Sequence, residues 1–112
     1  MTKTYNEVIE RAHRRIRVLA SDEPLSAEMR ATGIELLEAL SDEVALHTSV
    51  YWYDDYVPKE VFLPLSYLLA VELAPEYNRA APESRPRALM RLMEVTRRDD
   101  RNENINKSAT YM

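Results

Sequence analysis

Few residues of this chain have the type and spacing that catalysis or metal binding requires. The two histidines, His13 and His47, belong to separate segments, and His13 has only Glu10 at a helical spacing that a metal site would use. We interpret both histidines as surface residues. Acidic pairs at positions 22–23, 54–55 and 99–100 fall in predicted loops or a polar tail. Acid–base catalysis needs one carboxyl group that is desolvated, so we expect no catalytic residues.

Composition excludes further classes of site. The chain has no cysteine, which removes thiolate metal ligands and a cysteine nucleophile, and its single glycine excludes a glycine-rich phosphate loop. No apolar stretch approaches the roughly 20 residues that span a bilayer. We therefore expect no metal, no cofactor and no membrane partner, and a non-enzymatic helical domain inside the cell.

Charged residues are distributed unevenly along the chain. The face of the first predicted helix opposite its apolar stripe carries four arginines, and the second predicted helix has an acidic outer face. Arginines can bind a phosphate backbone, but the net charge of −4 disfavours a dedicated DNA-binding domain. We predict instead that the two faces pair between copies of the chain, the alternative being that both are simply solvated. The predicted contact residues are Arg11, Arg14, Arg15, Arg17, Glu35, Glu38, Asp42 and Glu43.

Aromatic residues gather in the segment 48–57, which interrupts the helical pattern. β-branched and aromatic residues predict extended chain, with a short hairpin around Asp54 and Asp55. Aromatic side chains in a loop can anchor an interface because they bury a large area at low entropic cost. Tyr51, Trp52 and Tyr53 are therefore candidate contact residues, and the alternative is that they fold back over the core.

The elements that position these residues are four helices, so the predicted fold class is all-α. The first helix has a capping box at Thr4 and Glu7 and an apolar stripe that extends to Leu19. The second begins after Ser26 and contains Gly33, which suggests close approach by another backbone. The third starts between positions 59 and 64, with Pro64 in its first turn, and ends at position 73. Pro82 and Pro86 introduce the fourth helix, whose predicted inward residues are Leu89, Leu92, Met93 and Thr96.

The apolar period stops near residue 97. Residues 97–112 contain too few apolar side chains to offset the entropic cost of ordering them, so this tail should be disordered alone and should order on a partner. We accordingly divide the chain into a helical domain, residues 1–96, and an extended C-terminal tail, residues 97–112.

The order of these segments resembles a phage family. The similar segments are TYNEVIERA at 4–12, GIELLEAL at 33–40, LPLSYLLA at 63–70 and LAPEY at 73–77. Over residues 4–95 this pattern is similar to the head-to-tail adaptor family of short-tailed bacteriophages, also called packaged-DNA stabilisation, head-completion or tail accessory factors. The ending LAPEY of the third helix is its most specific part. Two features depart from the family pattern: the loop at 48–57 is compact and aromatic, and the chain is short for the family.

The resemblance implies a structural function. Family members assemble as a ring, typically a dodecamer, beneath the portal protein, seal the packaged DNA and present a surface to the next tail or nozzle protein. It implies residence in the virion, with assembly in the host cytoplasm, and contact with DNA only as the contents of the channel. A C-terminal extension along the portal would place the portal contact at Arg97, Arg98, Arg101, Asn102, Asn104 and Tyr111. The aromatic residues Tyr51, Trp52 and Tyr53 would then face the tail.

Two other functions compete with this interpretation. A small helical DNA-binding regulatory protein would use the basic first helix and would bind duplex DNA in a salt-dependent manner. A helical enzyme, for example a muramidase-like hydrolase, would lose turnover when one of its carboxylates is changed to an amide.

Overall fold

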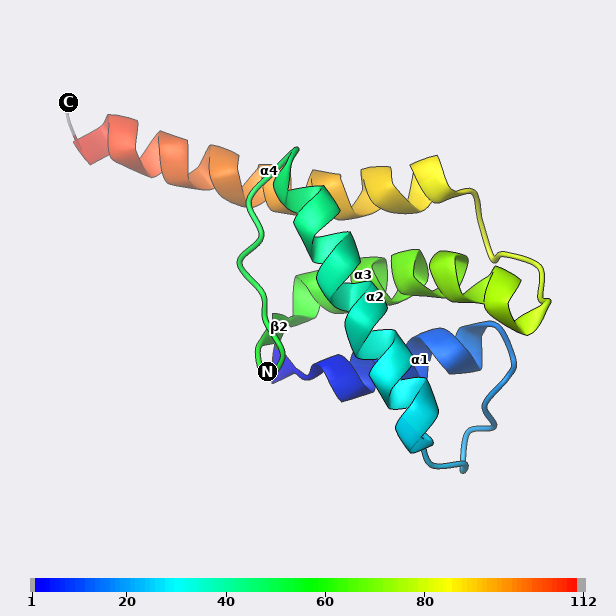
Figure 1. Ribbon diagram of the computed structural model, residues 1–112. Helices are drawn as coiled ribbons and strands as arrows, with labels where there is room; N and C mark the ends of the chain where they lie inside the picture. Colours follow the sequence, from blue (N-terminus) through cyan, green and yellow to red (C-terminus); the bar gives the residue numbers. More distant parts are fainter. Residues whose placement is uncertain (1, 111–112) are drawn as a thin grey trace.

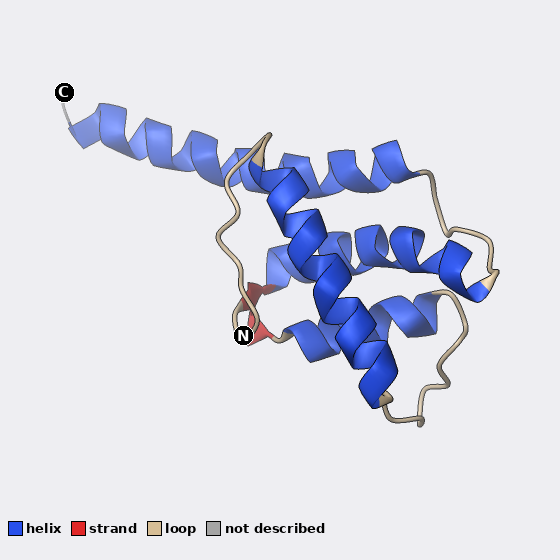
Figure 2. Cartoon of the chain, viewed as in Figure 1, coloured by secondary structure: helices blue, strands red, loops and turns tan. Residues whose placement is uncertain are grey.

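Four α-helices build the fold, which confirms the all-α prediction. The computed structural model describes the backbone of residues 2–110 and the side chains of residues 2–97. Its elements are β1 (Thr2–Lys3), α1 (Tyr5–Arg15), α2 (Ala27–Ala45), β2 (Val57–Pro58), α3 (Lys59–Leu73), the 3-10 helix η1 (Ala74–Tyr77) and α4 (Arg85–Thr110). In Figures 1 and 2, α1, α3 and α4 lie side by side with α3 in the middle, and α2 crosses them diagonally.

The first helix begins as predicted but ends early. The Thr4 hydroxyl accepts a hydrogen bond from the Glu7 backbone, and the Glu7 carboxylate accepts one from the Thr4 backbone, which completes the capping box. The prediction that the helix reaches Leu19 is wrong. Arg17 adopts a left-handed conformation with φ of 62°, which ends the helix, although Leu19 is still buried. The apolar spacing therefore predicted the burial of Leu19 correctly, although the helix ends before this residue.

The second helix crosses the first at its glycine. Ser26 caps α2 as predicted, its hydroxyl accepting from the Met29 backbone at 3.1 Å. A Cβ atom at Gly33 would lie 2.6 to 2.8 Å from three side-chain atoms of Ile9. The predicted close approach at Gly33 is present, but the neighbouring group is a side chain of α1 rather than a backbone.

The segment 48–57 forms the predicted small hairpin. Tyr53 and Tyr56 exchange two backbone hydrogen bonds of 3.0 Å around the turn at positions 54–55. The next two residues form β2, which pairs antiparallel with β1 at the N-terminus. The sequence did not predict this pairing, because a strand of two residues carries no periodic pattern.

The third helix is the centre of the molecule. It packs against α1, α2 and α4, and it is buried on several sides, as its apolar density predicted. Pro64 lies inside this helix and not in its first turn, because the helix already begins at Lys59. The chain leaves α3 through η1, where Asn78 adopts a left-handed conformation that caps the short helix.

The fourth helix is longer than the apolar pattern indicates. Leu92 and Thr96 face the core, as predicted, while Leu89 and Met93 are half-buried. The backbone continues as helix to Thr110, so α4 projects beyond the other helices instead of giving way to extended chain at residue 97 (Figure 1). No glycine or proline follows Pro86 to end the helix. That residues 97–112 are disordered in isolation stays a prediction.

Candidate interaction surfaces

The outer face of α2 is acidic and exposed. Glu35, Glu38 and Asp42 are exposed, in agreement with the pattern of the sequence. Glu43 is different, because both of its carboxylate oxygens accept hydrogen bonds from Arg85 Nη2 at 2.7 Å, and Arg85 also pairs with Glu72. These bonds to Glu43 and Glu72 raise the pKa of Arg85 above its usual value. Arg85 therefore joins α4 to Glu43 of α2 and Glu72 of α3 within one chain. This leaves three of the four predicted acidic contact residues facing outward.

The predicted arginine face of α1 is not a single open surface. Arg14 donates to Glu10 at 3.3 Å and to the Ala20 carbonyl at 3.4 Å, so it is engaged within the chain. Arg17 lies beyond the end of α1, in the left-handed turn, and so is not on the same helical face as the others. Arg11, Arg15 and Arg17 are exposed.

Three helices bring together a second basic cluster. The guanidinium carbons of Arg15 in α1 and Arg91 in α4 lie 5.0 Å and 5.2 Å from the ring centre of Tyr67 in α3. Glu83 accepts two hydrogen bonds from Arg91, at 2.9 and 3.0 Å. Cation–π contact of this kind holds both guanidinium groups in place at the surface. Periodicity within a single helix could not reveal this cluster, because its members come from three separate segments.

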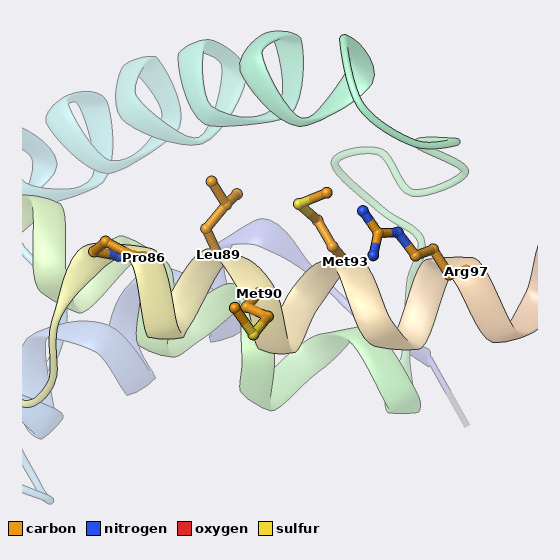
Figure 3. Close-up of a pocket in the computed structure, with 5 residues that line it drawn as sticks. All are labelled: Pro86, Leu89, Met90, Met93 and Arg97. Atoms are coloured by element: carbon orange, nitrogen blue, oxygen red, sulfur yellow. The ribbon is translucent and has the colours of Figure 1, made fainter.

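A shallow apolar groove runs along α4. It has a volume of about 230 Å³ and is lined by Pro86, Leu89, Met90, Met93 and Arg97. In Figure 3, Leu89, Met93 and Arg97 project from the same side of the helix. Met90 is 60% exposed, so the groove presents a large apolar side chain to solvent. Of the predicted portal-contact residues, Arg97 is exposed and lines this groove.

The other predicted portal-contact residues lie outside the part of the chain whose side chains the structure describes. The side chains of Arg98, Arg101, Asn102 and Asn104 lie outside the described set, as does Tyr111 altogether.

The aromatic loop divides into a buried part and an exposed part. Trp52 is only 4% exposed, and its indole Nε1 donates to the Ser41 hydroxyl at 3.1 Å. Tyr51 is half-buried and packs edge-on against Trp52, with ring centres 5.7 Å apart. Tyr53 is 63% exposed and stacks on Tyr56 at 5.5 Å. Trp52 thus follows the alternative of folding over the core, and Tyr53 with Tyr56 forms the exposed part.

His13 is a buried residue, which corrects its interpretation as a surface histidine. Its Nδ1 donates to the Ile9 carbonyl at 2.7 Å, and its Nε2 accepts from the Tyr77 hydroxyl at 3.0 Å. Burial lowers the pKa of His13 below its usual value and raises that of Tyr77. The sequence could not indicate this role because Tyr77 is 64 residues away. His47, by contrast, is exposed as expected.

Within the described residues, no group of three or more histidine, cysteine or carboxylate side chains is placed to hold a metal ion. In the same part of the chain, no helix has the length and hydropathy needed to cross a membrane. Comparisons with known protein families, with curated proteins and with solved structures find no match to this chain.

Proposed function

We propose that this protein is a structural head-to-tail adaptor of a short-tailed bacteriophage, which assembles as a ring, seals the packaged DNA beneath the portal and provides the attachment surface for the tail. The observation that carries the proposal is the set of separate exposed contact surfaces on one small helical body. These are the acidic face of α2, the apolar groove of α4 with its arginine, and the tyrosine pair of the hairpin. An assembly protein needs a separate surface for each partner that it binds.

Ring symmetry lets weak contacts act together. Each copy would make one modest contact with the portal and one with each neighbour, and closure of the ring multiplies their combined strength. The portal contact is assigned to Arg97 and the tail that follows, through Arg98, Arg101, Asn102, Asn104 and Tyr111. The tail-side contact is assigned to Tyr53, now joined by Tyr56, because these two rings are exposed and Trp52 is buried.

Contact between copies is assigned to opposite charges. The acidic half is the exposed part of α2, namely Glu35, Glu38 and Asp42. The basic half is a cationic surface of the neighbouring copy. Its exposed members from the original prediction are Arg11 and Arg15 of α1 and Arg17 just beyond the end of that helix. Such a pairing steers copies into one orientation and weakens as salt is added.

Removal of residues 97–112 tests the portal assignment. We expect the shortened chain to lose binding to portal rings of the same phage by about 100-fold or more, because it lacks the proposed contact segment. Binding is measured by sedimentation of the chain with assembled portal rings. A full-length variant with alanine at positions 97, 98 and 101 is the matched control, and we expect it to bind more weakly than the unchanged chain but to keep its helical circular dichroism. Unchanged portal binding by the shortened chain would refute the portal assignment.

The basic cluster around Tyr67 supports a second candidate, a DNA-binding regulatory protein. Arg15 and Arg91 from different helices could contact neighbouring phosphates of a duplex. This candidate requires salt-dependent binding of the isolated chain to duplex DNA, which weakens further when Arg15 and Arg91 are both replaced by glutamine. The adaptor function requires no such binding, so titration of a fluorescent duplex at low salt separates the two.

A further inference from the structure

Two large apolar side chains are exposed on different helices. Leu46, at the C-terminal end of α2, is 80% exposed, and Met90, in the groove of α4, is 60% exposed. An apolar projection and an apolar groove on the same molecule can join successive copies, because the projection of one copy enters the groove of the next.

The residues beside these side chains have matching spacing and opposite charge. On α2, Asp42 precedes Leu46 by four residues, and on α4, Arg97 follows Met93 by four residues. Two antiparallel helices can therefore place Asp42 opposite Arg97 while Leu46 lies opposite Met93, whereas a parallel arrangement would put Leu46 against the arginine. Residues four apart share a helix face, so each pair projects toward the same partner.

The charged members of this match are not engaged in ion pairs elsewhere in the described part of the chain. Among residues 2–97, the ion pairs involve neither Asp42 nor Arg97. Two other arginines of α4, Arg85 and Arg91, are instead held by carboxylates of their own chain.

We infer that the α4 groove of one copy receives the outer face of α2 from a second copy, in an antiparallel helix pair, with Leu46 in the groove and Asp42 beside Arg97. This inference rests on the proposed function, because it names the surface that joins ring neighbours. It replaces the α1 arginines as the basic half of that contact, and it moves Arg97 from the portal contact to the contact between copies. The α4 surface offers both a cation and an exposed apolar side chain. Helix α1 contributes none of the large apolar residues that are exposed in the described part of the chain. Apolar area supplies affinity that exposed charge pairs alone do not.

Self-association of the isolated full-length chain tests the inference without any portal. We expect the mass measured by analytical ultracentrifugation to rise with concentration between about 10 μM and about 1 mM, as a modest contact should. Met90→Glu and Leu46→Glu should each remove this association, because each places a carboxylate inside the apolar part of the contact. The neighbouring charges, Asp42 and Arg97, are already paired with each other in that contact. Both positions are exposed, so both variants should keep the circular dichroism of the unchanged chain.

Mixing the two variants gives the sharpest result. The Met90→Glu chain retains an intact α2 face and the Leu46→Glu chain retains an intact groove, so the mixture should form a heterodimer and nothing larger. Arg11→Glu is the control and should leave association unchanged.

Three results would overturn the inference. They are a monomeric chain at 1 mM, association that survives Leu46→Glu while Met90→Glu removes it, and association removed only by Arg11→Glu. The second result would mean that α4 pairs with α4 of another copy, and the third that the α1 arginines form the contact. If the chain gives any of these results but binds portal rings, the inference is refuted and the adaptor function is not. If the chain associates through the two surfaces but does not bind portal rings, only the adaptor function is refuted.

Discussion

Replacing Gly33 with alanine is expected to lower the free energy of unfolding by about 2 kcal/mol, because the new methyl group overlaps a closely packed neighbour. The added Cβ would lie 2.6 to 2.8 Å from Cγ1, Cγ2 and Cδ1 of Ile9, and Ile9 is completely buried. Alanine is intrinsically a better helix former than glycine by about 1 kcal/mol, so a stabilising result would be expected if α2 were free of α1. Denaturant unfolding followed by circular dichroism measures the difference.

A second substitution shows whether the overlap is the cause. In an Ile9→Ala background the three overlapping atoms are gone, so Gly33→Ala should cost at least about 1 kcal/mol less there than in the unchanged chain. Ala39→Gly, at an exposed position of α2, is the control for helix propensity alone and should cost about 1 kcal/mol in either background. Equal effects of Gly33→Ala in both backgrounds would show that α1 does not pack against Gly33 as described.

Loss of stability on mild acidification is the second large effect expected. His13 is buried and neutral in the folded chain, and burial lowers its pKa, whereas in the unfolded chain its pKa is near the ordinary value of about 6.5. The unfolded chain therefore takes up a proton first as the pH falls. The contribution of His13 to the free energy of unfolding is therefore complete above about pH 6.5. Below that pH it decreases by up to about 1.4 kcal/mol per pH unit.

The two histidines give a matched comparison. His13→Gln should lower the free energy of unfolding by about 2 kcal/mol at pH 7, through loss of the bonds to Ile9 and Tyr77, and should flatten its pH dependence between pH 5 and 6.5. His47→Gln, at an exposed site, should change neither quantity. A pH dependence that survives His13→Gln and disappears in His47→Gln would contradict the assignment of the buried residue.

Local signals in the sequence predicted most of the helical framework. The capping box at Thr4, the serine cap at Ser26 and the apolar density of α3 each depend on residues a few positions apart, and each is present in the structure. Tight packing at Gly33 was also predictable, because a glycine inside a helix has no local advantage.

Features that depend on distant residues could not be predicted in the same way. His13 finds its partner Tyr77 only after α1 and η1 are packed together, and Trp52 reaches Ser41 only after the loop folds back on α2. The same holds for Arg15 and Arg91 around Tyr67, which no single helix brings together. The end of α1 was misplaced because the apolar spacing of Leu19 reports burial and carries no information on backbone conformation.

The proposed site residues divide in the same manner. Exposure of Glu35, Glu38 and Asp42 followed from the pattern of a single helix, and the structure agrees. The bond of Glu43 to Arg85 and that of Arg14 to the Ala20 carbonyl did not follow from that pattern, because each joins a helix to a separate segment.

The mass of the complex between the full-length chain and assembled portal rings tests the central claim most directly. Native mass spectrometry of portal rings alone and with the chain in excess gives the number of copies bound. The adaptor function predicts a defined complex in which many copies, about one for each portal subunit, occupy the ring together with no partly filled rings, because neighbouring copies support one another. Portal rings whose mass does not change in the presence of excess chain would contradict it.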